Sequence, residues 1–238
     1  MTANAKPVVV LIPGMGNNAR IWTDQVNGLS DDYDVISADY CGAESIKEMA
    51  DRILKQVPTG AFSVVGFSLG GYIALDIIGR EAERIERLAL ISSSPYADSE
   101  EAIRQREFLI GKALQDYDSV LEDMGNFVVF GDGPNAEHTR EMLKIMGHEL
   151  GVEEFCRQQR AAMMRPDCRE QLGSIRCPVR VLCGENDPVT PVSGNRYLAD
   201  NIRGASLQIV GDCGHLLPLE RPAEVNRFLR DWLRLSAR

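Results

Sequence analysis

The clearest candidate for chemistry is Ser68, which lies in the segment GFSLG, residues 66–70. This G-x-S-x-G pattern follows an apolar run, residues 62–65, and precedes an apolar segment of helical character, residues 69–80. In that context the pattern is typical of a sharp strand-to-helix turn that exposes a nucleophilic serine. Its two glycines suit the turn because a Cβ at either position would collide with nearby backbone. An ordinary turn with a serine near a helix cap is the alternative.

A serine hydroxyl is a weak nucleophile and needs a base within hydrogen-bonding reach. His215 ends the segment GDCGH, residues 211–215, directly after a predicted strand, residues 207–210. The carboxyl ends of parallel strands lie at one edge of a sheet, so His215 is expected at the same edge as Ser68. His138 and His148 fall in a helical stretch, where alignment with the serine is less natural. We therefore predict that His215 is the general base.

A histidine base is oriented by a carboxylate, and Asp187 is well placed for that role. It lies in GENDPVTP, residues 184–191, after the predicted strand at residues 179–183. The chain order serine, acid, histidine is the order that accompanies a turn of this kind. Asp187 also suits a turn before Pro188, and the two roles are compatible.

Acyl transfer also needs donors for the negative charge that develops on oxygen. The segment PGMGN, residues 13–17, follows the first apolar run and is rich in small residues. We predict that the backbone N–H groups of Met15 and Leu69 converge on one oxygen beside Ser68. A plain glycine-rich turn is the alternative for this segment.

These residues require a scaffold in which strands and helices alternate. Apolar runs of strand length are predicted at residues 8–12, 35–38, 62–66, 88–91, 179–183 and 207–210, and helical patterns at 21–29, 46–57, 69–80, 194–201 and from Pro222 onward. Continuous apolar runs are typical of parallel strands that are covered on both faces. The sequence therefore predicts an α/β fold with a doubly wound, mostly parallel sheet of six strands.

The middle of the chain interrupts this alternation. Residues 95–173 contain helical segments and turn residues such as Gly151, but no convincing strand. So long a stretch exceeds an ordinary connection, and we predict an inserted helical cap, or lid. The predicted division is an α/β core of residues 1–94 and 174–238 with a cap of residues 95–173.

One helical segment of the cap suggests a substrate-binding face. Arg157, Arg160 and Met164 share one side of a helix, and an arginine there would hold a distal carboxylate of the substrate. We also predict that Phe67, which directly precedes Ser68, contacts the substrate. The alternative is that the arginines balance acidic residues on the surface while the methionines pack the cap.

Composition excludes several classes of protein. The 238 residues carry 35 acidic and 26 basic side chains, a net charge of −9 that disfavours nucleic acid as a partner. No apolar run is long enough to span a bilayer, and residues 1–6 lack the pattern of a secretory signal. The six cysteines and three histidines show no spacing typical of a metal site. We expect a cytoplasmic protein without membrane association, metal or cofactor, and make no prediction of its oligomeric state.

The motifs together resemble the α/β-hydrolase superfamily, in particular its small branch with a helical cap. The matching segments are LIPGMGNN (11–18), VVGFSLGGYIAL (64–75), RIERLALISSSP (84–95), CPVRVLCGENDPVTP (177–191) and GDCGHLLPLERP (211–222). The resemblance covers both ends of the sheet but not the cap. It implies Ser68 as nucleophile, Asp187 as acid, His215 as base, and Met15 and Leu69 as oxyanion donors.

The expected function is that of a serine hydrolase that needs no cofactor. Its substrate would be a small-molecule carboxylic ester or lactone, cleaved through an acyl-enzyme. The same residues would also serve a C–C bond hydrolase or a thioesterase. A hydrolase-like ligand receptor with little turnover is an alternative of a different class, because a fold alone does not fix function.

Overall fold

The computed structural model describes residues 6–131 and 133–235, so residues 1–5 of the N-terminal segment considered above lie outside it. Its centre is a six-stranded sheet in the order β2-β1-β3-β4-β5-β6, with every neighbouring pair parallel. The strands are β1 (Val8–Ile12), β2 (Asp34–Ser37), β3 (Phe62–Phe67), β4 (Ile85–Ile91), β5 (Val179–Gly184) and β6 (Ser206–Val210). The predicted fold class is confirmed.

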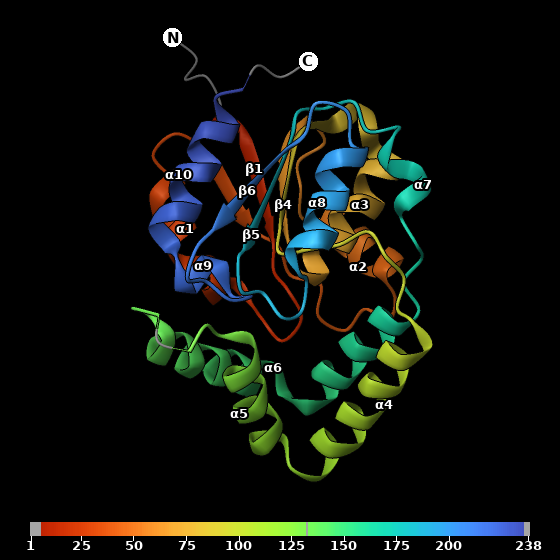
Figure 1. Ribbon diagram of the computed structural model, residues 1–238. Coiled ribbons are helices and arrows are strands. Elements are labelled where there is room, and N and C mark those ends of the chain that lie inside the picture. The colour runs from red at the N-terminus through yellow and green to blue at the C-terminus, as the bar shows by residue number, and fades with distance from the viewer. Residues whose placement is uncertain (1–5, 132, 236–238) are drawn as a thin grey trace.

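Helices cover both faces of this sheet (Figure 1). One face packs against α2 (Ile46–Leu54), α3 (Leu69–Glu81) and α8 (Val192–Asn201), and the other against α1 (Thr23–Leu29), α9 (Leu217–Glu220) and α10 (Pro222–Leu233). Side chains of β1 alternate between the two cores, with Val10 on one side and Val9 on the other. Each strand of this kind must be apolar on both faces, which explains the continuous runs in the sequence.

Local sequence explains where the core helices begin. Ser45 caps α2 by accepting a hydrogen bond from the Glu48 backbone, as expected of a serine at this position. Pro222 begins α10, where its missing N–H carries no penalty. The described residues also form three shorter helical segments: η1 (Ala19–Trp22), η2 (Ala82–Arg84) and α7 (Arg169–Leu172).

The helical insertion follows β4. It contains α4 (Glu100–Gln115), α5 (Tyr117–Val128) and α6 (Ala136–Met163), which form a V beneath the sheet edge (Figure 1). Gly151 interrupts α6 with φ 81° and ψ 162°, a conformation that favours glycine, so the two halves of α6 follow different arms of the V. The cap has a small core of its own around Phe155 and Val120. The predicted boundary residues of the two domains remain a prediction.

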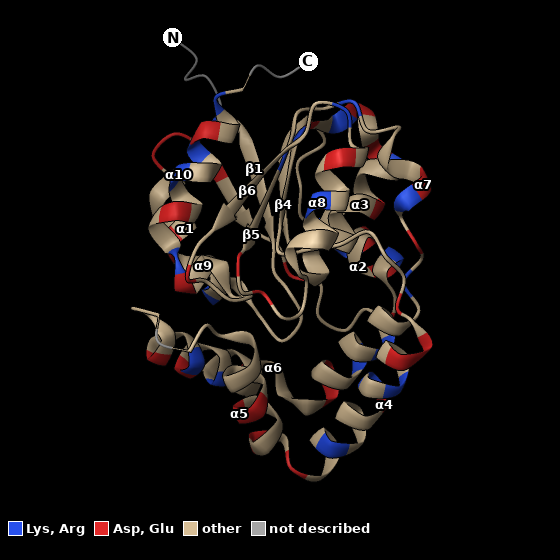
Figure 2. Cartoon of the chain, in the orientation of Figure 1, with Lys and Arg blue, Asp and Glu red and all other residues tan. Residues whose placement is uncertain are grey.

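Charged residues are interspersed over the core and the cap. Figure 2 shows Lys and Arg beside Asp and Glu on most helices, without a large area of one sign in this view. None of the helices in the described part of the chain is long and apolar enough to cross a membrane.

Candidate active site

Ser68 lies at the turn between β3 and α3, where the backbone is strained. Its φ of 51° and ψ of −115° are rare for a residue with a side chain, and such strain is concentrated at functional sites. A Cβ at Gly66 would lie 2.4 Å from the Gly70 carbonyl oxygen, and one at Gly70 would lie 2.3 Å from the Ile12 oxygen. Only glycine fits both positions, as the sequence predicts.

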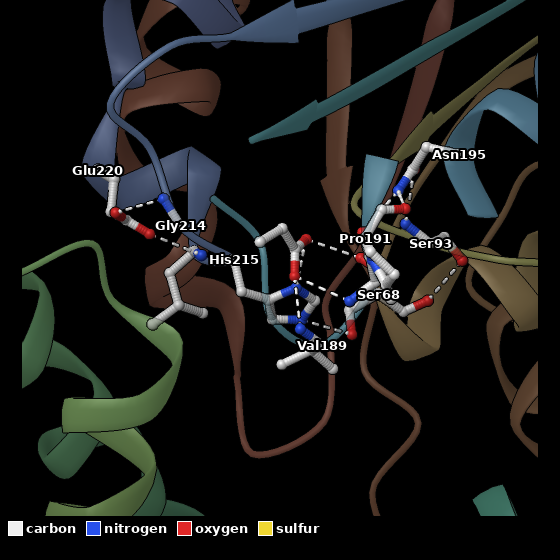
Figure 3. Close-up of polar contacts among 11 residues, drawn as sticks. Ser68, Ser93, Val189, Pro191, Asn195, Gly214, His215 and Glu220 are labelled. Carbon is white, nitrogen blue, oxygen red and sulfur yellow. Dashed lines mark hydrogen bonds and ion pairs between the residues drawn. The ribbon is translucent and has the colours of Figure 1, made fainter. Parts of the chain in front are cut away.

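The structure brings together the three side chains predicted to form the triad. His215 Nε2 lies 2.9 Å from Ser68 Oγ, and His215 Nδ1 lies 2.8 Å from Asp187 Oδ2 (Figure 3). The imidazole packs on the Phe67 ring, with 5.2 Å between the ring centroids. Phe67 is fully buried and does not line the cavity that Ser68 lines. This buried position against the imidazole does not agree with the prediction that Phe67 contacts the substrate.

The Asp187 carboxylate is almost fully enclosed and richly hydrogen-bonded. Oδ1 accepts from the backbone N–H groups of Val189 and Thr190 at 2.9 and 2.8 Å, and Oδ2 accepts from Thr190 Oγ1 at 2.7 Å. Burial alone would raise the pKa of Asp187. The neighbouring His215 and the hydrogen bonds from His215 and Thr190 outweigh burial and hold this pKa below its usual range. Asp187 is therefore a permanent anion at neutral pH.

A hydrogen-bonded chain connects the serine turn to the aspartate loop. Ser93 Oγ donates to the Ser68 carbonyl at 3.0 Å, and the Ser93 N–H donates to Asn195 Oδ1 at 3.1 Å. The same Asn195 donates through Nδ2 to the Thr190 carbonyl at 2.8 Å. Figure 3 shows Ser93 and Asn195 on the side of Ser68 away from Glu220. This chain fixes the two loops relative to each other.

The loop that carries His215 is held by a buried carboxylate and by the cap. Glu220 accepts from the backbone N–H groups of Gly214 and Leu216, each at 2.9 Å (Figure 3). It also accepts from the backbone N–H of Phe130 in the cap at 3.0 Å. The His215 N–H donates to the Val128 carbonyl of the cap at 2.8 Å. The imidazole position is thus tied to the α5 arm of the V.

The segment after β1 is held by the other arm. Met15 and Leu69 both line the cavity together with Ser68, and Leu69 is the first residue of α3. The N–H groups of a first helical turn have no acceptor within their own helix. In the cap, Gln158 Oε1 accepts from the Gly16 N–H at 2.9 Å, and Gln158 Nε2 donates to buried Glu154 at 3.1 Å. Because the Met15 N–H is predicted to hold the oxyanion, we call residues 13–17 the oxyanion loop.

A cavity of about 380 Å³ lies between the cap and the sheet edge. Ser68 and His215 form part of its wall, and residues of the cap form much of the rest. Its apolar residues come mainly from the cap and include Ala102, Leu109, Leu121, Met124, Phe127, Val128, Leu143 and Phe155. Its charged cap residues are Asp98, Arg106 and Arg165. The arrangement suits a small, partly apolar molecule with a reactive centre at Ser68.

The predicted substrate-binding face of the cap is displaced from this cavity. Arg157, Arg160 and Met164 line a separate surface hollow, Arg157 forms an ion pair with Glu154, and Met164 is 67% exposed. In the half of α6 that follows Gly151, the residues that line the cavity are Phe155, Gln159 and Ala162, on a neighbouring helical face. The sequence reasoning followed the arginines, whereas packing turns a face of glutamine and apolar side chains inward.

Several residues of the site carried only weak signals in the sequence. Thr190 stands in a turn segment where an Asp–Thr hydrogen bond is common, and Glu220 is a single acid within an apolar stretch. Gln158, Asn195 and Arg106 lie on helices without any motif, so only the packed structure places them at the site. Among the described residues, no cluster of three or more His, Cys, Asp or Glu side chains is arranged to hold a metal ion.

Known proteins share this architecture. Residues 9–228 match the alpha/beta hydrolase family. A protein from Serratia proteamaculans that bears the name putative carbamate hydrolase RutD is 25% identical over 95% of this chain and 91% of its own length. A pimeloyl-[acyl-carrier protein] methyl ester esterase from Nitrosomonas europaea is 24% identical over 94% of each chain. The structure of a thermophilic esterase from Thermogutta terrifontis superposes with a TM-score of 0.84 at 25% identity, covering 97% of this chain and 90% of the esterase.

The match covers nearly the whole chain, and both the sheet order and the serine turn agree with it. The chain belongs to the α/β-hydrolase family.

Proposed function

We propose that this protein is a serine hydrolase that cleaves a small carboxylic ester through an acyl-enzyme. The observation that carries the proposal is the unbroken line of hydrogen bonds from Ser68 through His215 to Asp187, at 2.9 and 2.8 Å, at the wall of a cavity. Relatives that include esterases support ester bonds as the target.

The proposed reaction follows from the positions of these groups. His215 takes the Ser68 proton through Nε2 while Oγ attacks the ester carbonyl, and Asp187 stabilises the resulting imidazolium. The backbone N–H groups of Met15 and Leu69 hold the oxyanion. His215 then protonates the departing alcohol, which leaves Ser68 acylated. A water molecule, deprotonated by His215, attacks the acyl group, and the acid is released as Ser68 recovers its proton. None of these steps requires a cofactor.

Fluorophosphonate labelling tests the nucleophile. The reagent should modify Ser68 in the wild-type protein, and S68A should remain unlabelled. With p-nitrophenyl esters of increasing chain length, S68A and H215A should each lose roughly 10³- to 10⁶-fold in kcat, and the double variant should be scarcely slower because the residues act as a unit. Labelling elsewhere, or additive losses, would contradict this assignment.

The same assay separates the alternatives left by the sequence. Thioesters, lactones, a carbamate and a C–C substrate belong in the panel, because all of them would use the same serine and histidine. Turnover is expected to be highest for esters. Tight binding of esters without turnover, in a protein that is not labelled by fluorophosphonate, would instead indicate a receptor.

A further inference from the structure

One cation lies in the cavity wall beside the oxyanion loop. Arg106 of α4 lines the cavity together with Ser68, and its Nη1 lies 3.9 Å from Met15 Sδ. Nη1 also donates to Gln159 Oε1 at 2.7 Å, and Nε donates to Asp98 Oδ2 at 2.6 Å. The side chain is 23% exposed. Its guanidinium is therefore held in a fixed position at the cavity surface.

The charges around Arg106 do not balance. Within the part of the chain that the structure describes, the cavity lining contains one acidic side chain, Asp98, and two arginines, Arg106 and Arg165. Arg165 is 6% exposed, contacts the other oxygen of Asp98 at 2.6 Å and donates to two backbone carbonyls. The two arginines share one carboxylate, so the cavity wall has a surplus positive charge, although the whole chain carries −9.

The opposite arm of the V presents a different surface. The α5 residues that line the cavity, Leu121, Met124, Phe127 and Val128, are all apolar, and α4 and α5 form opposite arms (Figure 1). In a cavity lined largely by apolar side chains, a fixed guanidinium attracts an anion more strongly than it would on an open surface. The cavity thus matches a molecule with one apolar part and one anionic part.

We propose that Arg106 binds a free carboxylate of the substrate, and that the substrates are esters which carry such a group. This inference rests on the proposed ester hydrolysis at Ser68 and names its substrate class. The carboxylate can belong to the acyl part, as in a half-ester of a dicarboxylic acid, or to the alcohol part, as in an acylated hydroxy acid. A planar, bidentate donor such as guanidinium suits a carboxylate in either case.

The test compares esters that differ only in this charge. Monomethyl esters of succinic to suberic acid are paired with their neutral monoamides, and O-acetyl hydroxy acids are paired with their amides. At neutral pH the wild-type protein should prefer the carboxylate member of one series by roughly 10- to 100-fold in kcat/KM. The series that shows the preference identifies which part of the substrate carries the charge.

Variants locate the preference. R106Q should reduce the ratio of the two kcat/KM values towards one, and R106K should give an intermediate ratio. R104Q is the matched control, because Arg104 lies on the same helix, is 61% exposed and pairs with Glu101 outside the cavity. It should leave the ratio unchanged. Since each ratio is measured within one variant, a general loss of activity cancels.

Three outcomes distinguish the proposals. Equal rates for both members of every pair, or a preference that survives in R106Q, would overturn the role of Arg106 and leave ester hydrolysis standing. No hydrolysis of any ester together with no labelling of Ser68 would overturn the proposed function itself. Should R106Q not fold, inhibition of the wild-type protein by a free dicarboxylic acid is compared with inhibition by its diamide. The inhibition constant of the acid should be at least about 10-fold lower than that of the diamide. Equal inhibition by the two compounds would refute the proposal.

Discussion

At the scale of single residues, Asp187 is expected to keep its charge over the pH range in which the proposed activity is measured. The His215 charge and the hydrogen bonds from His215 and Thr190 overcome the effect of burial and keep the Asp187 pKa below its ordinary value. A lowered pKa means that the carboxylate stays ionised as the pH falls from neutral to about 5. Protonation of Asp187 is therefore not expected to contribute to any loss of activity over this range.

We therefore expect that, on acidification from about pH 8 to pH 5, the slope of log kcat/KM against pH does not exceed one, because Asp187 adds no second protonation. Initial rates on a neutral ester across that range give the slope. A slope of two would show that a second group, such as Asp187, also titrates and would contradict its permanent charge. D187N should lower kcat by about 10⁴-fold, because an amide does not stabilise the imidazolium.

At the scale of elements, α6 reaches into the site through Gln158. Its side chain accepts from the Gly16 N–H of the oxyanion loop and is itself oriented by Glu154. In the proposed reaction the oxyanion forms in the transition state, so a displaced loop should reduce kcat more than it affects KM.

We expect Q158L to lower kcat about 10-fold. The variant also loses two buried hydrogen bonds, which should cost about 1 kcal/mol each in stability. Steady-state kinetics and urea unfolding measure the two effects. R160Q is the control, because Arg160 is exposed on the same helix and lies outside the cavity. A variant Q158L with raised KM and unchanged kcat would assign Gln158 to substrate contact instead.

Elements also differ in how well the sequence predicts them. The β1 strand was predictable to the residue because a parallel strand between two helical layers is apolar throughout, as in Val8–Ile12. The serine turn was predictable because its glycines are required by backbone contacts. The inward face of α6 was not, since its direction depends on the turn of the chain at Gly151 and on packing against α4. Arg106 was missed for the same reason: no local pattern marks which side of α4 meets the cavity.

At the scale of the whole molecule, both halves of the proposed machinery are hydrogen-bonded to the cap. The oxyanion loop is held through Gln158 on one arm of the V. On the other arm, the Val128 carbonyl accepts from the His215 N–H. Glu220 of α9 accepts both from the Gly214 N–H in the His215 loop and from the Phe130 N–H in the cap. A movement of the cap away from the sheet edge would break these contacts together.

Amide hydrogen exchange provides the measurement. The Gly16 and His215 amides should exchange through one shared opening, with similar protection that is weaker than that of the central strand β3. A fluorophosphonate bound to Ser68 should slow both to the same extent. Clearly different opening free energies at the two amides would show that the arms move independently.

The double attachment of the cap has a consequence for timing. A cap that lifts from the sheet edge to admit a substrate would lose the contacts that align His215 and the oxyanion loop, so we expect substrate entry and bond cleavage to occur in different conformations. Water that enters with the substrate would then meet a misaligned triad. Catalysis would resume once the cap has closed over the bound substrate.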